Sequence, residues 1–283
     1  MKKLLIAAAL AAAAVATSLA HAGALERIKS SKAINVAFSP ESLPFSFRVG
    51  DEAPKGYSID LCKRVIAQVV RAAGVPEAKV NWLPGTTPQR LQMVASGKAD
   101  LECANTSQTL ARMANVDFSS LIFIETGGLM ARVDSKGGRL SDLAGKKIAV
   151  LKGTTTEAAL RQALQKRLVN AEVVTIEAAG DGVTMLDSGA VQAYAGDSIK
   201  LVGLMIQTKD PTQYGLMNDE LSYEAFAFAL PRNDSAMRLE VNRALSQMYR
   251  GGEIGPIYGQ WLGPLGSPTD LLKAMYMLNA IPD

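Results

Sequence analysis

Two kinds of apolar spacing take turns along this chain, and their alternation restricts the fold more than any other feature. Ile34, Val36 and Phe38 occupy every second position, as in a half-buried strand, and Leu61 and Val65 then begin a stripe with helical spacing. Strand patterns that alternate with helical patterns are typical of sheets whose strands are connected through helices. The sequence therefore predicts an α/β fold with mainly parallel sheets flanked by helices.

The alternation continues to the end of the chain and restarts once. Further strands are expected at residues 79–83, 100–104, 147–151, 172–176, 190–195 and 223–230. Helices are expected at residues 88–96, 157–168, 182–188, 198–207 and 237–250. The second copy of the pattern follows Gly137 and Gly138, and a chain of about 260 residues after a leader suits two lobes of ordinary size.

The first 22 residues have the pattern of a secretory leader. Lys2 and Lys3 precede an apolar run at residues 4–15, and residues 20–22 (AHA) form a small-x-small cleavage site. An uncleaved membrane anchor is the alternative, although the apolar run is short for a span. Because the residue directly after the cleavage site is not a cysteine, a lipid anchor is not expected. We expect residues 1–22 to be a signal peptide, cleaved after Ala22, and the protein to lie in the periplasm of a Gram-negative bacterium.

Charge and histidine content exclude several classes of function. The formal charge of +3 falls by two units when Lys2 and Lys3 leave with the leader, so nothing favours nucleic acid as a partner. The only histidine, His21, leaves with it. Histidine-based catalytic triads and histidine-ligated metals are thus excluded, and we expect neither a metal nor another cofactor.

Cys62 and Cys103 are the only cysteines in the chain. A pair of cysteines in an oxidising compartment is typically bridged, so we expect a disulfide within one lobe. The alternative is two buried thiols, one in the helix after the first strand and one in the strand at residues 100–104.

The stretch SGKADLECANTSQTLARMANVDFS, residues 96–119, carries the clearest signal of a binding site. A short strand leads into hydroxyl and amide residues that favour turns, and Ser107 or Thr109 can cap a helix whose first turn contains Arg112. Free backbone N–H groups, hydroxyls and a guanidinium then surround one point, which suits a carboxylate because arginine grips both oxygens. The alternative for Arg112 is an exposed position on the helix surface.

This stretch, with DFS at residues 117–119, resembles the motif of periplasmic amino-acid-binding proteins, the soluble receptors of polar-amino-acid ABC importers. The similarity extends along nearly the whole mature chain. It implies the two-lobed type II periplasmic binding protein fold, with two crossover strands. Lobe one would comprise residues 23–123 and 229–283 and lobe two residues 127–223, with hinges near residues 124–126 and 224–228.

The resemblance also implies how the head of an amino acid is held. Arg112 would bind the α-carboxylate from lobe one, and Asp197, in the run YAGDSIKL, would bind the α-ammonium from lobe two. The alternative for Asp197 is an N-cap of the helix that follows it. Other positions that match head-contacting residues of the family are Asn105, Ser107, Gly153, Thr154 and Thr155. Independently, Thr154 and Glu157 have the spacing of a capping box, which could present the amides of this turn to an anion.

The resemblance says less about which amino-acid side chain the protein binds. Receptors for glutamine or basic amino acids sandwich the side chain between two aromatics, but the matching positions here are Ser42 and Thr87. Thr87 and Arg90 instead resemble the Ser/Thr-x-x-Arg pattern of glutamate/aspartate receptors, as do the runs LECANTS and LKGTTTE. Arg90 would then bind a side-chain carboxylate; the alternative is a solvated arginine in the first turn of its helix.

Two departures weaken the case for an acidic ligand. Further basic positions of the acidic-amino-acid receptors fall on Ser39 and Ala179, so a second carboxylate would have fewer partners, and an isolated buried carboxylate is costly. A neutral polar amino acid therefore remains open, with Ser39 as a possible contact. Phe45 and Phe47 are expected in the cleft wall and the lobe core, where Phe45 is also a candidate ligand contact.

The leading hypothesis is a monomeric receptor, not an enzyme, that closes on a free polar amino acid and delivers it to an inner-membrane ABC permease. A periplasmic dehydratase of prephenate-like acids on the same scaffold is one alternative. It would need a carboxyl as general acid, and Glu102 and Glu125 are not distinctive candidates. A sensing receptor that presents its ligand to a chemoreceptor or kinase is the other.

Overall fold

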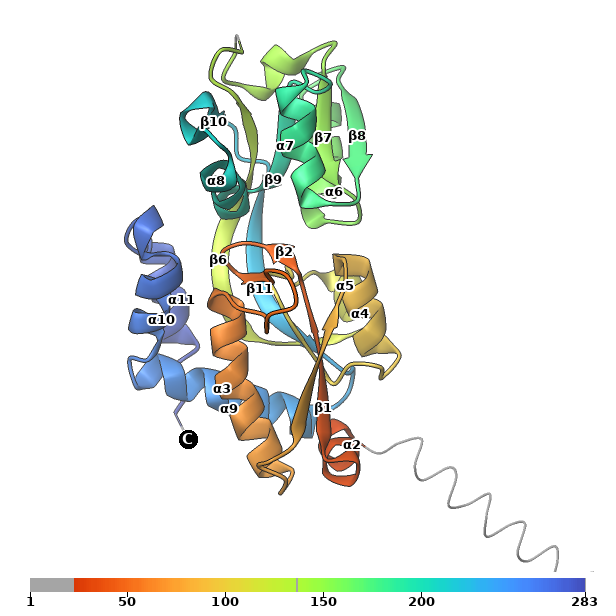
Figure 1. The fold of residues 1–283 in the computed structure, drawn as a ribbon, viewed down its shortest axis with the longest axis vertical. Coiled ribbons are helices and arrows are strands. Elements are labelled where there is room, and N and C mark those ends of the chain that lie inside the picture. The colour runs from red at the N-terminus through yellow and green to blue at the C-terminus, as the bar shows by residue number, and fades with distance from the viewer. Residues whose placement is uncertain (1–22, 136, 283) are drawn as a thin grey trace, which may run out of the picture.

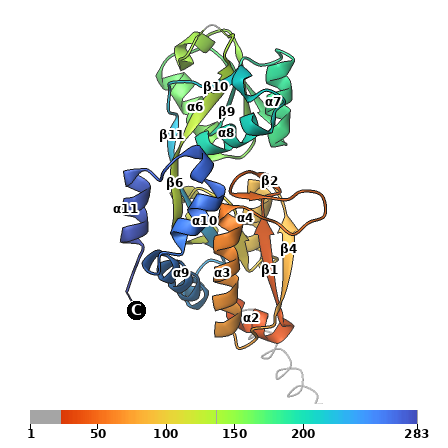
Figure 2. The ribbon, with the colours of Figure 1, turned by 60° about the vertical axis from the view of Figure 1, so that its left-hand side comes forward.

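A computed structural model describes residues 23–135 and 137–282 of the chain. The expected signal peptide lies outside the described residues. Figures 1 and 2 show two lobes, one above the other, each built of strands covered by helices. The strands of the described residues form a nine-stranded sheet that runs through both lobes and a separate two-stranded hairpin. The predicted two-lobed α/β architecture is therefore confirmed.

Lobe one contains the N-terminal and C-terminal parts of the described chain. Its strands are β1 (Ala33–Phe38), β4 (Lys79–Pro84) and β5 (Leu101–Cys103), with the hairpin β2 (Glu41–Ser42) and β3 (Ser46–Phe47). Its helices are α2 (Ala24–Ser31), α3 (Tyr57–Ala72), α4 (Thr87–Ala95), α5 (Leu110–Met113), α9 (Ser235–Arg250), α10 (Ile254–Trp261), α11 (Asp270–Leu278) and the short 3-10 helix η3 (Gly263–Leu265). Strand β1 lies between β4 and β5 and pairs with both in parallel. The carboxyl ends of these strands therefore point the same way, toward lobe two.

Lobe two repeats the arrangement with fewer elements. Its strands are β7 (Lys147–Leu151), β8 (Glu172–Ile176), β9 (Ala193–Asp197) and β10 (Tyr214–Leu216). Its helices are α6 (Thr155–Lys166), α7 (Ala179–Asp187), α8 (Ser198–Gln207) and the 3-10 helices η1 (Leu140–Leu143) and η2 (Pro211–Gln213). Strand β7 pairs in parallel with β8 and with β9. As in lobe one, the loops that leave the carboxyl ends of the strands gather at one edge.

Two long antiparallel strands join the lobes, β6 (Asp117–Arg132) and β11 (Ser222–Leu230). Glu224 of β11 lies opposite Glu125 of β6. Further along β6, Gly127 pairs with Asp197 at the end of β9. The sheet edges at the carboxyl ends of the strands in both lobes therefore meet the crossover strands near the same level of the molecule, as Figure 1 shows.

Each lobe has its own apolar core. Lobe one is centred on buried aromatic side chains, which are Phe45, Tyr57, Phe123 and Phe226. They pack mainly edge to face, which is a favoured arrangement of aromatic rings. Lobe two buries separate clusters, one including Ile148 and Leu160 and another including Ala149 and Tyr194. Ile199 of α8 packs against the core of lobe one, and polar side chains such as Asn105 and Asp197 also meet between the lobes.

The predicted disulfide is confirmed: Cys62 of α3 and Cys103 of β5 are bridged. Both cysteines are fully buried in lobe one. The bridge connects the first long helix to the strand that precedes Asn105. Within the described residues, no helix combines the length and the apolar character needed to cross a bilayer.

Local signals explain where predicted and observed elements agree or differ. Strands β7 and β8 and helix α8 have the predicted bounds. Helix α9 begins two residues earlier than expected because Asp234 accepts a hydrogen bond from the Met237 N–H and so caps it. The hairpin β2–β3 and the helices α2, α10 and α11 were not predicted, since they are short or lack a long periodic pattern.

Candidate functional site

Arg112 lies at the boundary between the lobes. Thr109 caps the short helix α5 by accepting a hydrogen bond of 3.1 Å from the Arg112 N–H, as the sequence predicted for Ser107 or Thr109. The Arg112 guanidinium donates to the carbonyl of Ser107 at 2.7 Å and, across the boundary, to the carbonyl of Gly153 at 3.5 Å. The pKa of Arg112 is lowered from its ordinary value, because the effect of burial outweighs that of the nearby carboxylates. The group is thus a half-buried cation aimed between the lobes, where an anion can reach it.

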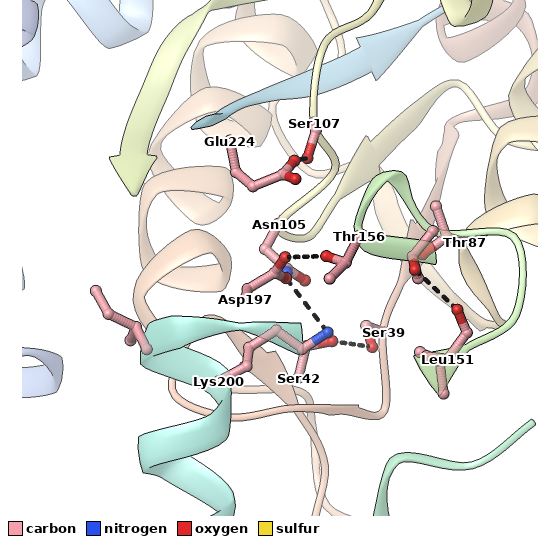
Figure 3. A network of polar contacts seen from close by, with 12 residues as sticks. Ser39, Ser42, Thr87, Asn105, Ser107, Leu151, Thr156, Asp197, Lys200 and Glu224 are labelled. Atoms are coloured by element: carbon pink, nitrogen blue, oxygen red, sulfur yellow. Dashed lines mark hydrogen bonds and ion pairs between the residues drawn. The ribbon is translucent and has the colours of Figure 1, made fainter. Parts of the chain in front are cut away.

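Asp197 faces the same boundary from lobe two. It stands at the N-cap position of α8, but its carboxylate makes no capping hydrogen bond. Glu125 takes that role, because its Oε2 accepts from the Ile199 N–H at 2.8 Å. The Asp197 carboxylate instead accepts from Asn105 of lobe one at 2.8 Å and from Thr156 at 3.2 Å, as seen in Figure 3. The N-cap alternative therefore does not describe this side chain, whose carboxylate faces the boundary and lies 3.5 Å from Nζ of Lys200.

A third acidic side chain, Glu224, holds together hydroxyls from both lobes. Ser107 of lobe one donates to it, and Thr155 of lobe two donates to the same oxygen at 2.7 Å. Ser222 donates to the other oxygen at 2.6 Å, and only 1% of Glu224 is exposed. Ser107 and Thr155 thus lie together at the boundary, with their hydroxyls directed at a carboxylate of the protein itself.

The turn that begins with Gly153 forms only part of the predicted capping box. Thr154 caps α6 by accepting from the Glu157 N–H at 3.1 Å, as expected. Glu157, however, accepts from the Gly153 N–H at 2.8 Å, one residue before the expected partner. Gly153 has a φ of +73°, and a Cβ there would lie 2.6 Å from Cγ of Pro88 in lobe one. Glycine is therefore required both by the turn and by the close approach of the lobes.

Arg90 differs from both of its predicted roles. Its side chain is 3% exposed, so the solvated alternative is wrong. The guanidinium bonds Glu102 at 2.7 Å and the Gly85 carbonyl at 2.8 Å, while its remaining nitrogen donates to Thr87 and Thr106 at 3.2 Å each. Because the buried Glu102 already balances the charge, Arg90 is a weak candidate for a ligand carboxylate.

A cavity of about 240 Å³ lies between the lobes next to these residues. Its wall includes the positions considered from the sequence, which are Ser39, Ser42, Thr87, Arg90 and Ala179, and also Lys200. The hydroxyls of Ser39 and Ser42 are hydrogen-bonded to each other at 2.7 Å. The structure thus brings both positions of the missing aromatic sandwich and both lost basic positions to one cavity.

Phe45 is a core residue. It is fully buried, and its ring lies 5.1 Å from that of Phe123 and 5.3 Å from that of Phe226. It is not part of the wall of the 240 Å³ cavity, so direct ligand contact gains no support. Phe47 is half-buried and packs edge to face on Trp261.

Sequence reasoning missed two charged residues of the boundary, Lys200 and Glu224, and named Glu125 only as an undistinctive candidate for a general acid. Lys200 follows Asp197 by three residues, a spacing that puts both on one face of a helix start. Glu224 is the one charge in the apolar run YEAFAFAL, which could have marked it. Glu125 is buried beside Asp197 and Glu224. Its burial raises its pKa well above the ordinary value, and repulsion from the Asp197 carboxylate adds to this shift.

The site offers hydrogen-bond donors and acceptors that suit an organic zwitterion. Among residues 23–135 and 137–282, no group of three or more histidine, cysteine, aspartate or glutamate side chains is arranged to hold a metal ion. One lobe contributes a guanidinium and the other a carboxylate. Such a pair can orient a small molecule that carries both charges.

Comparisons with known proteins identify the family of the chain. Residues 34–264 match the family described as bacterial extracellular solute-binding proteins, family 3. The chain is 30% identical over 259 residues to an L-glutamate/L-aspartate-binding protein of Pseudomonas aeruginosa, covering 91% of this chain and 85% of that protein. It is 27% identical over 240 residues to a glutamate/aspartate import solute-binding protein of Salmonella typhimurium, covering 84% and 78%.

Solved structures share the fold. A mutant of ArgBP from T. maritima superposes with a TM-score of 0.74 at 22% identity, covering 85% of this chain and 99% of that one. A solute receptor for L-cysteine from Neisseria gonorrhoeae gives a TM-score of 0.74 at 21% identity, covering 85% and 94%. At these identities the likeness concerns the fold alone.

Proposed function

Because the chain belongs to family 3 of the bacterial extracellular solute-binding proteins, we propose that it captures a free polar L-amino acid for an ABC importer. The curated relatives named above are binding proteins for glutamate and aspartate, and this supports an amino acid as ligand. It also favours a receptor over the dehydratase considered from the sequence. In this proposal the protein binds its ligand and performs no chemistry on it.

One observation carries the proposal: Arg112 of lobe one and Asp197 of lobe two reach the same boundary. Arg112 contacts the Gly153 carbonyl of lobe two, and Asp197 contacts Asn105 of lobe one. We assign the α-carboxylate of the ligand to Arg112 and its α-ammonium to Asp197. The polar groups of Ser107 and Thr155 border this position.

Closure of the lobes would complete the site. The two halves of the charge complement belong to different lobes, so the ligand binds the closed arrangement more strongly than an open one. Residues 124–126 of β6 and 224–228 of β11 are the proposed hinges, with lobe one at residues 23–123 and 229–283 and lobe two at residues 127–223. Hinge closure around a ligand is the general motion of periplasmic binding proteins.

The proposed setting is the periplasm, reached through a signal peptide cleaved after Ala22. A monomer in its closed form would dock on an inner-membrane permease. A role in sensing would use the same closed form with a different membrane partner.

Calorimetry with the common L-amino acids tests the function. Arg112→Ala and Asp197→Asn should each weaken binding by roughly 30-fold or more, the usual effect of truncating one partner of a buried charge pair. Arg64→Ala and Asp270→Asn are matched controls, because both side chains are exposed on the outer surface of lobe one. Wild-type affinity in either site variant, with the fold intact by circular dichroism, would overturn the assignment.

A further inference from the structure

Lys200 is a cation that the proposed function leaves without a role. It lies in the first turn of α8, with its side chain 15% exposed and its Nζ 3.5 Å from the Asp197 carboxylate. Figure 3 shows this amine between Asp197 and the Ser39–Ser42 pair. Lys200 lines both the 240 Å³ cavity and a small pocket beside Asp197. Lys200 therefore lies between the predicted site for the amino-acid head group and the 240 Å³ cavity.

The other charges of the cavity wall already have partners. Arg90 is neutralised by Glu102, and both are buried. Glu41 accepts a hydrogen bond of 3.1 Å from the Ala179 N–H. Glu177 pairs with Lys152 at 2.9 Å, and both side chains are mostly exposed. Among the described residues of this wall, Lys200 is thus the cation whose partner a ligand would take.

Competition for Asp197 has a direct electrostatic consequence. When an α-ammonium binds Asp197, the Lys200 ammonium loses the carboxylate that balances it. A largely buried ammonium without an anion is unfavourable. A second carboxylate on the ligand, placed in the cavity, restores the balance, and the hydroxyls of Ser39, Ser42 and Thr87 can donate to it.

We propose that Lys200 is a specificity residue, which leaves Asp197 when the ligand binds and pairs with a side-chain carboxylate in the cavity. The ligand is then an α-amino dicarboxylic acid. The inference rests on the proposed function. It assigns to Lys200 the charge that Arg90 cannot offer because of Glu102, and it places that charge in the same cavity as Ser39 and Ala179.

The competing outcome is that Lys200 turns to Glu41 or Glu177 at the rim of the cavity. A neutral side chain would then bind as well as an acidic one. Pairs of ligands that differ only in charge separate the two outcomes. L-glutamate with L-glutamine, and L-aspartate with L-asparagine, are such pairs.

Calorimetry on the full mature chain at neutral pH tests the proposal. The wild type should bind one of the two acids at least roughly 30-fold more tightly than its amide. Lys200→Leu should remove most of that preference, by weakening binding of the acid and by strengthening binding of the amide, which no longer leaves a buried ammonium without an anion. Lys200→Gln serves as a second variant in case the leucine disturbs the fold. Lys147→Leu is the control, because it removes the same charge from an exposed position at the opposite end of lobe two.

Each result has a defined meaning. A wild type that binds the amides as tightly as the acids, or Lys200 variants that keep the preference for acids, would overturn the role of Lys200 while leaving amino-acid binding intact. Loss of all ligands in the Lys200 variants would make Lys200 a general part of the site and would also overturn it. A wild type that binds no amino acid, or an unimpaired Arg112→Ala variant, would instead remove the proposed function.

Discussion

The carbonyl oxygen of Leu43 in lobe one faces Gly203 in lobe two so closely that a Cβ on Gly203 would lie 2.8 Å from that oxygen. Gly203 lies within α8, where alanine would otherwise be favoured over glycine. The conflict arises only because the two lobes are in contact. Gly203 thus reports on closure and not on the folding of its own helix.

Gly203→Ala should therefore oppose closure. We expect ligand binding to weaken by about 1–3 kcal/mol, the usual cost of forcing an extra methyl group into a packed contact. Calorimetry measures the loss, and small-angle scattering should give a larger radius of gyration at saturating ligand than for the wild type. Gly180→Ala in α7 is the control, since a Cβ there meets nothing within 4 Å. Equal affinities of both variants would contradict this role.

Glu102→Gln should destabilise the protein strongly. It would leave the Arg90 guanidinium buried without its anion, and breaking a buried ion pair in this way costs about 3–5 kcal/mol. Urea unfolding measures the change. Glu52→Gln, which breaks an exposed pair with Lys55, should change the free energy of unfolding by less than about 1 kcal/mol. Similar losses in the two variants would mean that burial does not set the strength of the Arg90 pair.

The raised pKa of Glu125 predicts a particular dependence of stability on pH. Burial beside Asp197 keeps this carboxyl protonated in the folded protein at pH values where the unfolded chain has already ionised it. The folded state then binds more protons, so the free energy of unfolding falls as the pH rises from about 4.5 through the folded pKa. Below the unfolded pKa this stabilisation is fully present.

Glu125→Gln should remove that part of the decline, because the amide does not ionise and can still accept from the Ile199 N–H. Thermal unfolding between about pH 4.5 and 9 should show the variant gaining on the wild type as the pH rises. Glu172→Gln, at an exposed position, should run parallel to the wild type. A Glu125 variant that also runs parallel would contradict the shift.

Replacing both cysteines by alanine should lower the free energy of unfolding by about 4 kcal/mol, the chain-entropy estimate for a bridge across 41 residues. Chemical unfolding of the double variant and of the oxidised wild type gives the difference. Thiol titration of the denatured wild type checks the bridge itself. Two reactive thiols in the untreated protein would refute it.

The sequence predicted the fold well because much of it is encoded locally. The run KIAVL became β7 and EVVTI became β8 with the predicted bounds, since short apolar strands bounded by turns have few alternatives. The hairpin β2–β3 could not be predicted in the same way. It consists of two-residue strands whose pairing depends on the rest of lobe one.

The site shows where local reasoning ends. Arg112 was predicted from its turn of small polar residues and Asp197 from the family resemblance, and both side chains lie at the boundary between the lobes. The state of Arg90 was not predicted, since its partner Glu102 lies on a different strand and becomes adjacent only after folding. The same holds for Glu224, since two of its three hydroxyl donors, Ser107 and Thr155, come from opposite lobes.

The disulfide between Cys62 and Cys103 lies two residues before Asn105. The loop that contains Asn105 is therefore restrained before the protein meets a ligand. Oxidation ties the loop that begins at Ala104 and contains Asn105 to the long helix α3 when the chain first folds. The loop is thus ordered during maturation, so its conformational entropy is not lost again each time a solute binds. In the proposed function, lobe one then offers the ligand a half-site that is already ordered, and lobe two completes the site on closure.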